Sequence, residues 1–125
     1  MRRALRWPRR AGWPRSRSSK IAVGTAIGRD GAPVVRVFAA AFDSRLVFSY
    51  DPEARRVDAT IRTGRGPHAL AFDTQLDGDD VHAYLFVGHF TDSYLGVVDL
   101  DLRRPDTFGT LFASVGTPTP PRESR

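Results

Sequence analysis

The sequence predicts an all-β protein built from two four-stranded antiparallel sheets. Along residues 20–118, short runs rich in Val, Ile, Leu, Phe and Tyr alternate with clusters of Gly, Asp, Pro and Ser. Strands and tight turns produce this pattern. In addition, residues 37–64 are similar to residues 85–116, so the chain contains a unit of about fifty residues twice.

The correspondence between the two units can be followed along the chain. The spacing between corresponding residues grows from 48 to 50 and then to 52, which predicts two insertions of two residues each. Upstream, a spacing of 48 places residues 21–25 against residues 69–73. The corresponding pairs are Phe38 and Phe86, Val47 and Val97, Asp51 and Asp101, and Gly64 and Gly116.

Each unit contains four expected strands, which together form one blade of a β-propeller. A propeller ring needs at least four blades, so two blades predict an incomplete ring whose outer apolar faces have no neighbour. The expected strands are residues 21–25, 34–42, 45–50 and 57–62 in the first blade, and 68–73, 83–90, 95–102 and 109–115 in the second.

Charge and composition divide the chain into a tail, two blades and a short C-terminal tail. Residues 1–29 carry nine basic and no acidic side chains, whereas residues 30–125 carry ten basic and fourteen acidic ones, a net charge of −4. Because the Arg-rich tail has no apolar periodicity, we expect it to be disordered. The predicted boundaries are 1–19 for this tail, 20–64 and 68–116 for the blades within 20–118, and 119–125 for the C-terminal tail.

Composition also excludes several kinds of bond and segment. The chain has no cysteine, which excludes disulfides and thiolate metal sites. It has no run of eighteen apolar residues, so no transmembrane segment is expected. No apolar stretch follows the arginines, so the tail does not predict a working signal peptide. Two interpretations of the tail remain. It is either translated sequence upstream of the true start or a basic arm that binds nucleic acid. We do not expect nucleic acid to be the principal partner.

Three histidines are candidates for a binding site. His68 begins one expected strand, whereas His82 and His89 lie near opposite ends of the next, so the sequence predicts no shared metal site. In a propeller the first strand of each blade lines the channel. We therefore name Arg65, His68 and His89 as candidate channel-lining, ligand-binding residues. The alternative is a loop that only packs against the next blade.

Two groups of acidic residues could also bind a metal ion or transfer protons. Residues 77–80, Asp-Gly-Asp-Asp, could offer oxygen ligands to calcium, but a solvated hairpin turn is the favoured interpretation. Asp99 and Asp101 alternate along one strand and so share a face, where they could form an acid–base pair if both are buried together. Otherwise they mark the end of the strand. Neither a hydrolase serine elbow nor a nucleotide-binding glycine motif is present, and we assign no catalytic residue and no cofactor.

Three further stretches are TGRGPHALAFD at residues 63–73, YLFVGHF at residues 84–90 and GVVDL at residues 96–100. In this order they resemble the YVTN or lactonase-like β-propeller repeats, which are often found in bacterial cell-envelope proteins. The resemblance covers residues 20–118 and implies a place in a ring of about seven blades. It also implies a periplasmic or cell-envelope location.

We therefore expect a non-catalytic propeller segment that acts as a binding or interaction scaffold for a protein or small ligand of unknown identity. Its neighbours would be missing blades of a parent chain or further copies of itself. The alternative is a fragment of a lactonase-like propeller enzyme, in which Arg65, His68 and His89 would border the channel. A weaker alternative is nucleic-acid binding through the basic tail.

Overall fold

The computed structural model describes residues 18–116, and within them it is all-β. Two antiparallel four-stranded sheets, each with its strands in sequence order, confirm the predicted fold class and are consistent with two propeller blades. The N-terminal sheet contains β1 (Ser18–Ile27), β2 (Pro33–Ala41), β3 (Leu46–Asp51) and β4 (Arg56–Arg62). The C-terminal sheet contains β5 (Pro67–Gln75), β6 (His82–His89), β7 (Leu95–Asp99) and β8 (Leu111–Val115).

The bounds of the strands differ from the expected ones by up to three residues, and the differences are largest at the end of β7 and the start of β1. β7 ends at Asp99 rather than at residue 102, because the chain turns away there and the next residues pair with the other sheet. β1 begins at Ser18, three residues before the expected start at residue 21. The predictions for residues 1–17 and for 119–125 lie outside the described residues.

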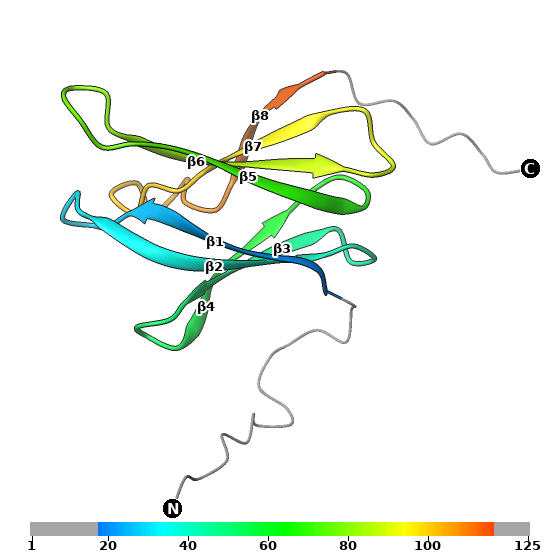
Figure 1. Cartoon of the computed structure of the whole chain (residues 1–125), viewed down its shortest axis with the longest axis horizontal. Helices are drawn as coiled ribbons and strands as arrows, with labels where there is room; N and C mark the ends of the chain where they lie inside the picture. The colour runs from blue at the N-terminus through cyan, green and yellow to red at the C-terminus, as the bar shows by residue number, and fades with distance from the viewer. Residues whose placement is uncertain (1–17, 117–125) are drawn as a thin grey trace, which may run out of the picture.

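The two sheets stack face to face, with β1 packed against β5 and β6 (Figure 1). In the core between them, the rings of Phe38 and Phe72 lie 5.2 Å apart. Ile27 adds two backbone hydrogen bonds: its N–H donates to the Leu100 carbonyl at 2.9 Å, and its carbonyl accepts from the N–H of Leu102 at 2.8 Å. The buried core residues are Ala26, Ile27, Phe38, Ala40, Val47, Ile61, Ala83, Leu85, Val87, Val98 and Leu100.

The positions of two bulges show that the expected spacing between the first strands, β1 and β5, is wrong by one residue. In β5 the bulge leaves His68 unpaired, opposite His89 and Gly88 of β6. In β1 the bulge leaves residue 19 unpaired, opposite Ala41 and Ala40 of β2. Residue 19 therefore corresponds to His68, and the spacing between the first strands is 49 rather than 48.

The third and fourth strands need a larger correction. The pairing of the third strand with the fourth shifts register once in each sheet, between Ser49 and Tyr50 in β3 and between Val97 and Val98 in β7. These equivalent positions are 48 residues apart. Asp51 therefore corresponds to Asp99, and the expected pairing of Asp51 with Asp101 is wrong.

The unpaired bulge residues of the fourth strands are Asp58 and Phe112, a spacing of 54. In place of two short insertions, six extra residues thus lie together in the connection between β7 and β8.

Candidate functional site

The loop that joins the two sheets, residues 63–66, is fastened to the connection between β6 and β7. The N–H of Gly64 donates to Nε2 of His89 at 3.0 Å, and the N–H of Arg65 donates to Oδ2 of Asp92 at 2.6 Å. In the other direction, the N–H of Phe90 donates to the Gly66 carbonyl at 2.8 Å. These three bonds fix the position from which β5 starts.

The two glycines of this loop are required by its packing. Gly66 has a φ of +62°, and a Cβ there would lie 2.8 Å from the ring of Phe42. A Cβ on Gly64 would run into the hydroxyl of Tyr94 and the carboxylate of Asp92. The Gly-Arg-Gly-Pro sequence therefore lets the backbone approach the neighbouring side chains closely.

His89 acts as a clamp between the loop and the β6–β7 connection. Its Nε2 accepts the Gly64 hydrogen bond, so its Nδ1 carries the proton and donates to the Tyr94 carbonyl at 3.0 Å. The ring also packs on the ring of Tyr94, with centroids 4.5 Å apart. With both nitrogens bonded to backbone groups, His89 has no lone pair left for a metal ion or a substrate proton in this arrangement.

His68 differs from His89. It occupies the bulge of β5 and is exposed, and its side chain makes no hydrogen bond to another residue within 18–116. Its ring meets that of Phe90 edge-on at 6.3 Å, and Phe90 in turn lies 6.1 Å from Phe42. The structure thus brings Arg65, His68 and His89 to the same end of the sheets. Of the two histidines, only His68 presents its imidazole to solvent.

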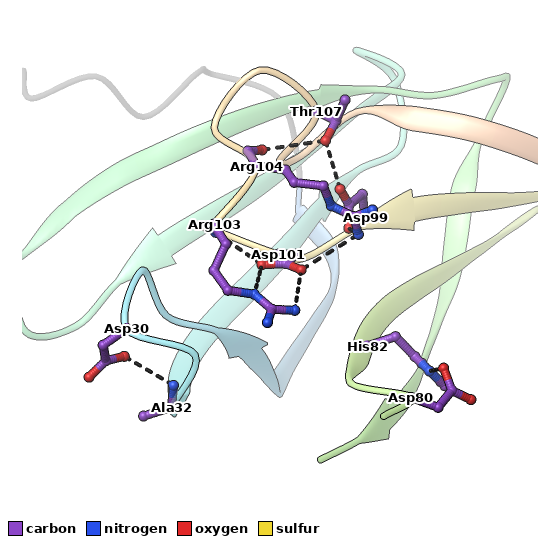
Figure 2. Close-up of polar contacts among 9 residues, drawn as sticks. All are labelled: Asp30, Ala32, Asp80, His82, Asp99, Asp101, Arg103, Arg104 and Thr107. Carbon is purple, nitrogen blue, oxygen red and sulfur yellow. Dashed lines mark hydrogen bonds and ion pairs between the residues drawn. The ribbon is translucent and has the colours of Figure 1, made fainter. Parts of the chain in front are cut away.

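Asp99 and Asp101 are buried together, at 4% and 2% exposure, beneath the connection between β7 and β8 (Figure 2). The Arg103 side chain donates from Nε to Oδ1 of Asp101 at 3.0 Å and from Nη2 to Oδ2 at 2.8 Å. Arg104 reaches Asp99 at 3.1 Å and Asp101 at 3.6 Å, so one guanidinium joins the two carboxylates. The hydroxyl of Thr107 donates to the other oxygen of Asp99 at 2.8 Å.

This arrangement favours a structural role for the aspartate pair. The side-chain hydrogen bond from Arg103 is the largest of several causes that lower the pKa of Asp101, which opposes a role as proton donor. Oxygens that already accept bonds from Arg103, Arg104 and Thr107 are poorly placed to take a proton from a substrate. The pair meets the condition of joint burial, but its partners neutralise it.

His82 forms a second polar cluster, on the far side of β6 from the core. Its Nε2 lies 3.1 Å from Asp73 and its Nδ1 lies 3.2 Å from Asp80, and its ring stacks on Tyr84 with centroids 4.9 Å apart. The hydrogen bond to Asp73 is the largest cause that raises the pKa of His82.

The two carboxylates of this cluster bond to opposite ring nitrogens, so they do not converge on one ion. Across residues 18–116, no group of three or more His, Asp or Glu side chains is arranged to hold a metal ion. The candidate calcium run, residues 77–80, lies in the turn between β5 and β6, and its Asp80 is committed to His82.

Within residues 18–116, each sheet also exposes large apolar side chains. We call the side of each sheet that points away from the other its outer face. The outer face of the N-terminal sheet exposes Ile21, Val23 and Val35 by 65%, 66% and 54%, and that of the C-terminal sheet exposes Phe112 and Val115 by 54% and 62%. A shallow depression of about 400 Å³ lies at the end of the N-terminal sheet, lined by Ser44, Arg45, Leu46, Thr60, Arg62 and Thr63.

No protein family, curated protein or solved structure matches this chain. The described residues include no helix that is long and apolar enough to cross a membrane. Sequence reasoning missed Asp92, Tyr94 and Thr107 as partners of the loop and of the aspartate pair. An accurate spacing of the fourth strands would have revealed the longer connection that carries Thr107, but no local pattern marks Asp92 or Tyr94.

Proposed function

We propose that this chain is a segment of a YVTN or lactonase-like β-propeller and acts as a non-catalytic binding and interaction scaffold. The observation that carries the proposal is the pair of apolar outer faces, one on each sheet. Exposed apolar patches of this kind mark interaction surfaces. The resemblance of the sequence to those repeats further suggests that the parent protein belongs to the bacterial cell envelope.

The polar groups that could perform chemistry support the same conclusion. Asp99 and Asp101 are paired with arginines, and His89 is bonded to backbone groups through both ring nitrogens. A hydrolase needs a base or a metal ion with free coordination positions near the substrate. Among the candidates from the sequence, His68 alone retains a free imidazole.

The test compares hydrolysis with surface binding. Full-length chain is assayed against a panel of lactones with and without added Zn²⁺, Mg²⁺ or Ca²⁺, beside the His68→Ala and Arg65→Ala variants. In parallel, an apolar fluorescent dye is titrated against the chain and against Val23→Asp, which places a charge on one outer face.

We expect no lactone hydrolysis that depends on His68 or Arg65, and dye binding that weakens in Val23→Asp. Metal-dependent hydrolysis that disappears in His68→Ala would overturn the scaffold proposal in favour of a lactonase-like enzyme fragment. Dye binding that is indifferent to the charge on the outer face would also count against it.

A further inference from the structure

The faces through which the two sheets contact each other are not equivalent positions of the repeat. In β2 the core residues are Phe38 and Ala40, whereas in β6 they are Leu85 and Val87. With the spacing of 48 in these strands, Leu85 corresponds to Val37, which points to the other side of its sheet from Phe38. The outer face of the N-terminal sheet is therefore the counterpart of the inner face of the C-terminal sheet, and the reverse also holds.

Most residues of the buried interface have an apolar counterpart on an outer face. On the N-terminal sheet, the counterparts of Leu70, Phe72, Leu85 and Val87 are Ile21, Val23, Val37 and Ala39. On the C-terminal sheet, the counterparts of Phe38, Ala40, Val47 and Ile61 are Phe86, Gly88, Leu95 and Val115. Three positions differ, because the counterparts of Gly24, Ala26 and Val34 are the polar residues Asp73, Gln75 and His82.

The two residues of one backbone hydrogen bond between the sheets also have counterparts in the other sheet. Ile27 donates its N–H to the carbonyl of Leu100. The counterpart of Ile27 is Leu76, which is 40% exposed just after β5. The counterpart of Leu100 is Pro52, which lacks an N–H but keeps the carbonyl that this bond requires.

We propose that a second copy of this chain docks head-to-tail on the first, with the outer face of its N-terminal sheet against the outer face of the C-terminal sheet. The contact continues the interface that already joins the two sheets within one chain. This inference rests on the proposed scaffold function and names its partner. One chain carries both complementary surfaces, whereas an unrelated partner would require only one of them.

The geometry of such a contact limits the assembly. Head-to-tail contacts form a ring when the rotation closes and an open filament when it does not. Propeller rings contain about four to eight blades. With two sheets per chain, a closed ring therefore contains two, three or four copies.

The first measurement is the mass of the full-length chain by light scattering over a wide concentration range. A single species of two, three or four times the 13.9 kDa chain mass, which stops growing at high concentration, is the expected result. A chain that stays monomeric at every concentration, or a ladder of species that keeps growing, would overturn the closed ring.

Two variants test the head-to-tail geometry. Val23→Asp charges only the outer face of the N-terminal sheet, and Val115→Asp charges only that of the C-terminal sheet. Each variant alone is expected to be monomeric, while an equimolar mixture forms a dimer through the two unaltered faces. Phe90→Asp is the matched control, because Phe90 is 73% exposed but lies at the end of the sheets, and it is expected to keep the wild-type mass.

Circular dichroism of each variant shows whether the strands are retained, and recovery of the dimer on mixing shows that both variants are folded. Single variants that keep the wild-type mass, or that pair with themselves and not with each other, would contradict the proposal. A monomeric chain whose outer faces still bind the dye would exclude the second copy while leaving the scaffold function standing. Lactone hydrolysis that depends on His68 would overturn the scaffold function whatever the mass.

Discussion

The rings of Phe38 in β2 and Phe72 in β5 lie 5.2 Å apart and join the two sheets at the centre of the core. Phe38 is fully buried, and Gly24 of β1 lies so close to Phe72 that a Cβ there would overlap its ring. The stacking of the sheets therefore depends on these aromatic side chains and on the absence of a side chain opposite them.

We expect Phe38→Ala to lower the free energy of unfolding by about 3–5 kcal/mol, because it removes a buried ring and leaves a cavity. Phe90→Ala is the control, and its effect should stay within about 0.5 kcal/mol because the ring is largely exposed. Urea unfolding followed by circular dichroism measures both. Equal effects of the two substitutions would show that the core does not lie between the sheets.

Acid should weaken the fold through Asp101. The pKa of its carboxyl is lowered below the ordinary value of 3.8, chiefly by the hydrogen bond from the Arg103 side chain. A lowered pKa contributes stability that is present above 3.8 and is lost as the pH falls below it, through the pKa of the folded state. The pKa of Asp51 is also lowered, chiefly by the hydrogen bond from the Ala54 N–H, and adds a second contribution in the same range.

Asp101→Asn tests this contribution. At neutral pH it should cost about 1.5–3 kcal/mol, because a neutral amide cannot replace the charge-assisted hydrogen bonds that the buried carboxylate accepts from Arg103. The loss of stability as the pH falls below 3.8 should be smaller than in the wild type, with the part that belongs to Asp51 remaining. Asp106→Asn, in an exposed position of the same connection, is the control. An unchanged acid dependence in Asp101→Asn would contradict the assignment.

The sign is opposite for His82. Its pKa is raised above 6.5, chiefly by the hydrogen bond to Asp73 and then by that to Asp80. The stability that it contributes is fully present below 6.5 and is lost as the pH rises through the raised pKa. Nuclear magnetic resonance of the ring protons should give a titration midpoint above 6.5 in the wild type and a lower one in Asp73→Asn. A midpoint that does not move in Asp73→Asn would rule out Asp73 as the cause.

The strands were predictable because their signals are local. All eight expected strands are present, since apolar runs between turn residues specify them without reference to the rest of the chain. The correspondence between the two sheets was not predictable at single-residue precision. In sheets that are apolar on both faces, a shift of one or two residues still matches apolar with apolar, as with Val47 against Val97 or Leu95.

The candidate site shows the same limit. The sequence placed Asp99 and Asp101 on one face, but their arginine partners depend on how a six-residue insertion folds back over them. The exposure of His68 follows from a bulge, and the engagement of His89 follows from a loop 25 residues earlier. Contacts between distant segments of this kind leave no periodic trace in the sequence.

The clamp made by His89 gives the last prediction. His89→Phe keeps an aromatic ring against Tyr94 but removes both hydrogen bonds, so the N–H of Gly64 and the carbonyl of Tyr94 lose their partner. Each unpaired group costs about 1–3 kcal/mol when it stays buried. We therefore expect a clear loss of stability, together with faster hydrogen exchange at the Gly64 amide.

His68→Phe is the matched control, because the same substitution at the exposed bulge removes no hydrogen bond within residues 18–116 and should leave the Gly64 amide protected. The experiment separates the two histidines. If His89→Phe left the exchange of Gly64 unchanged, the ring would not be holding the loop, and its nitrogens would again be open to a ligand.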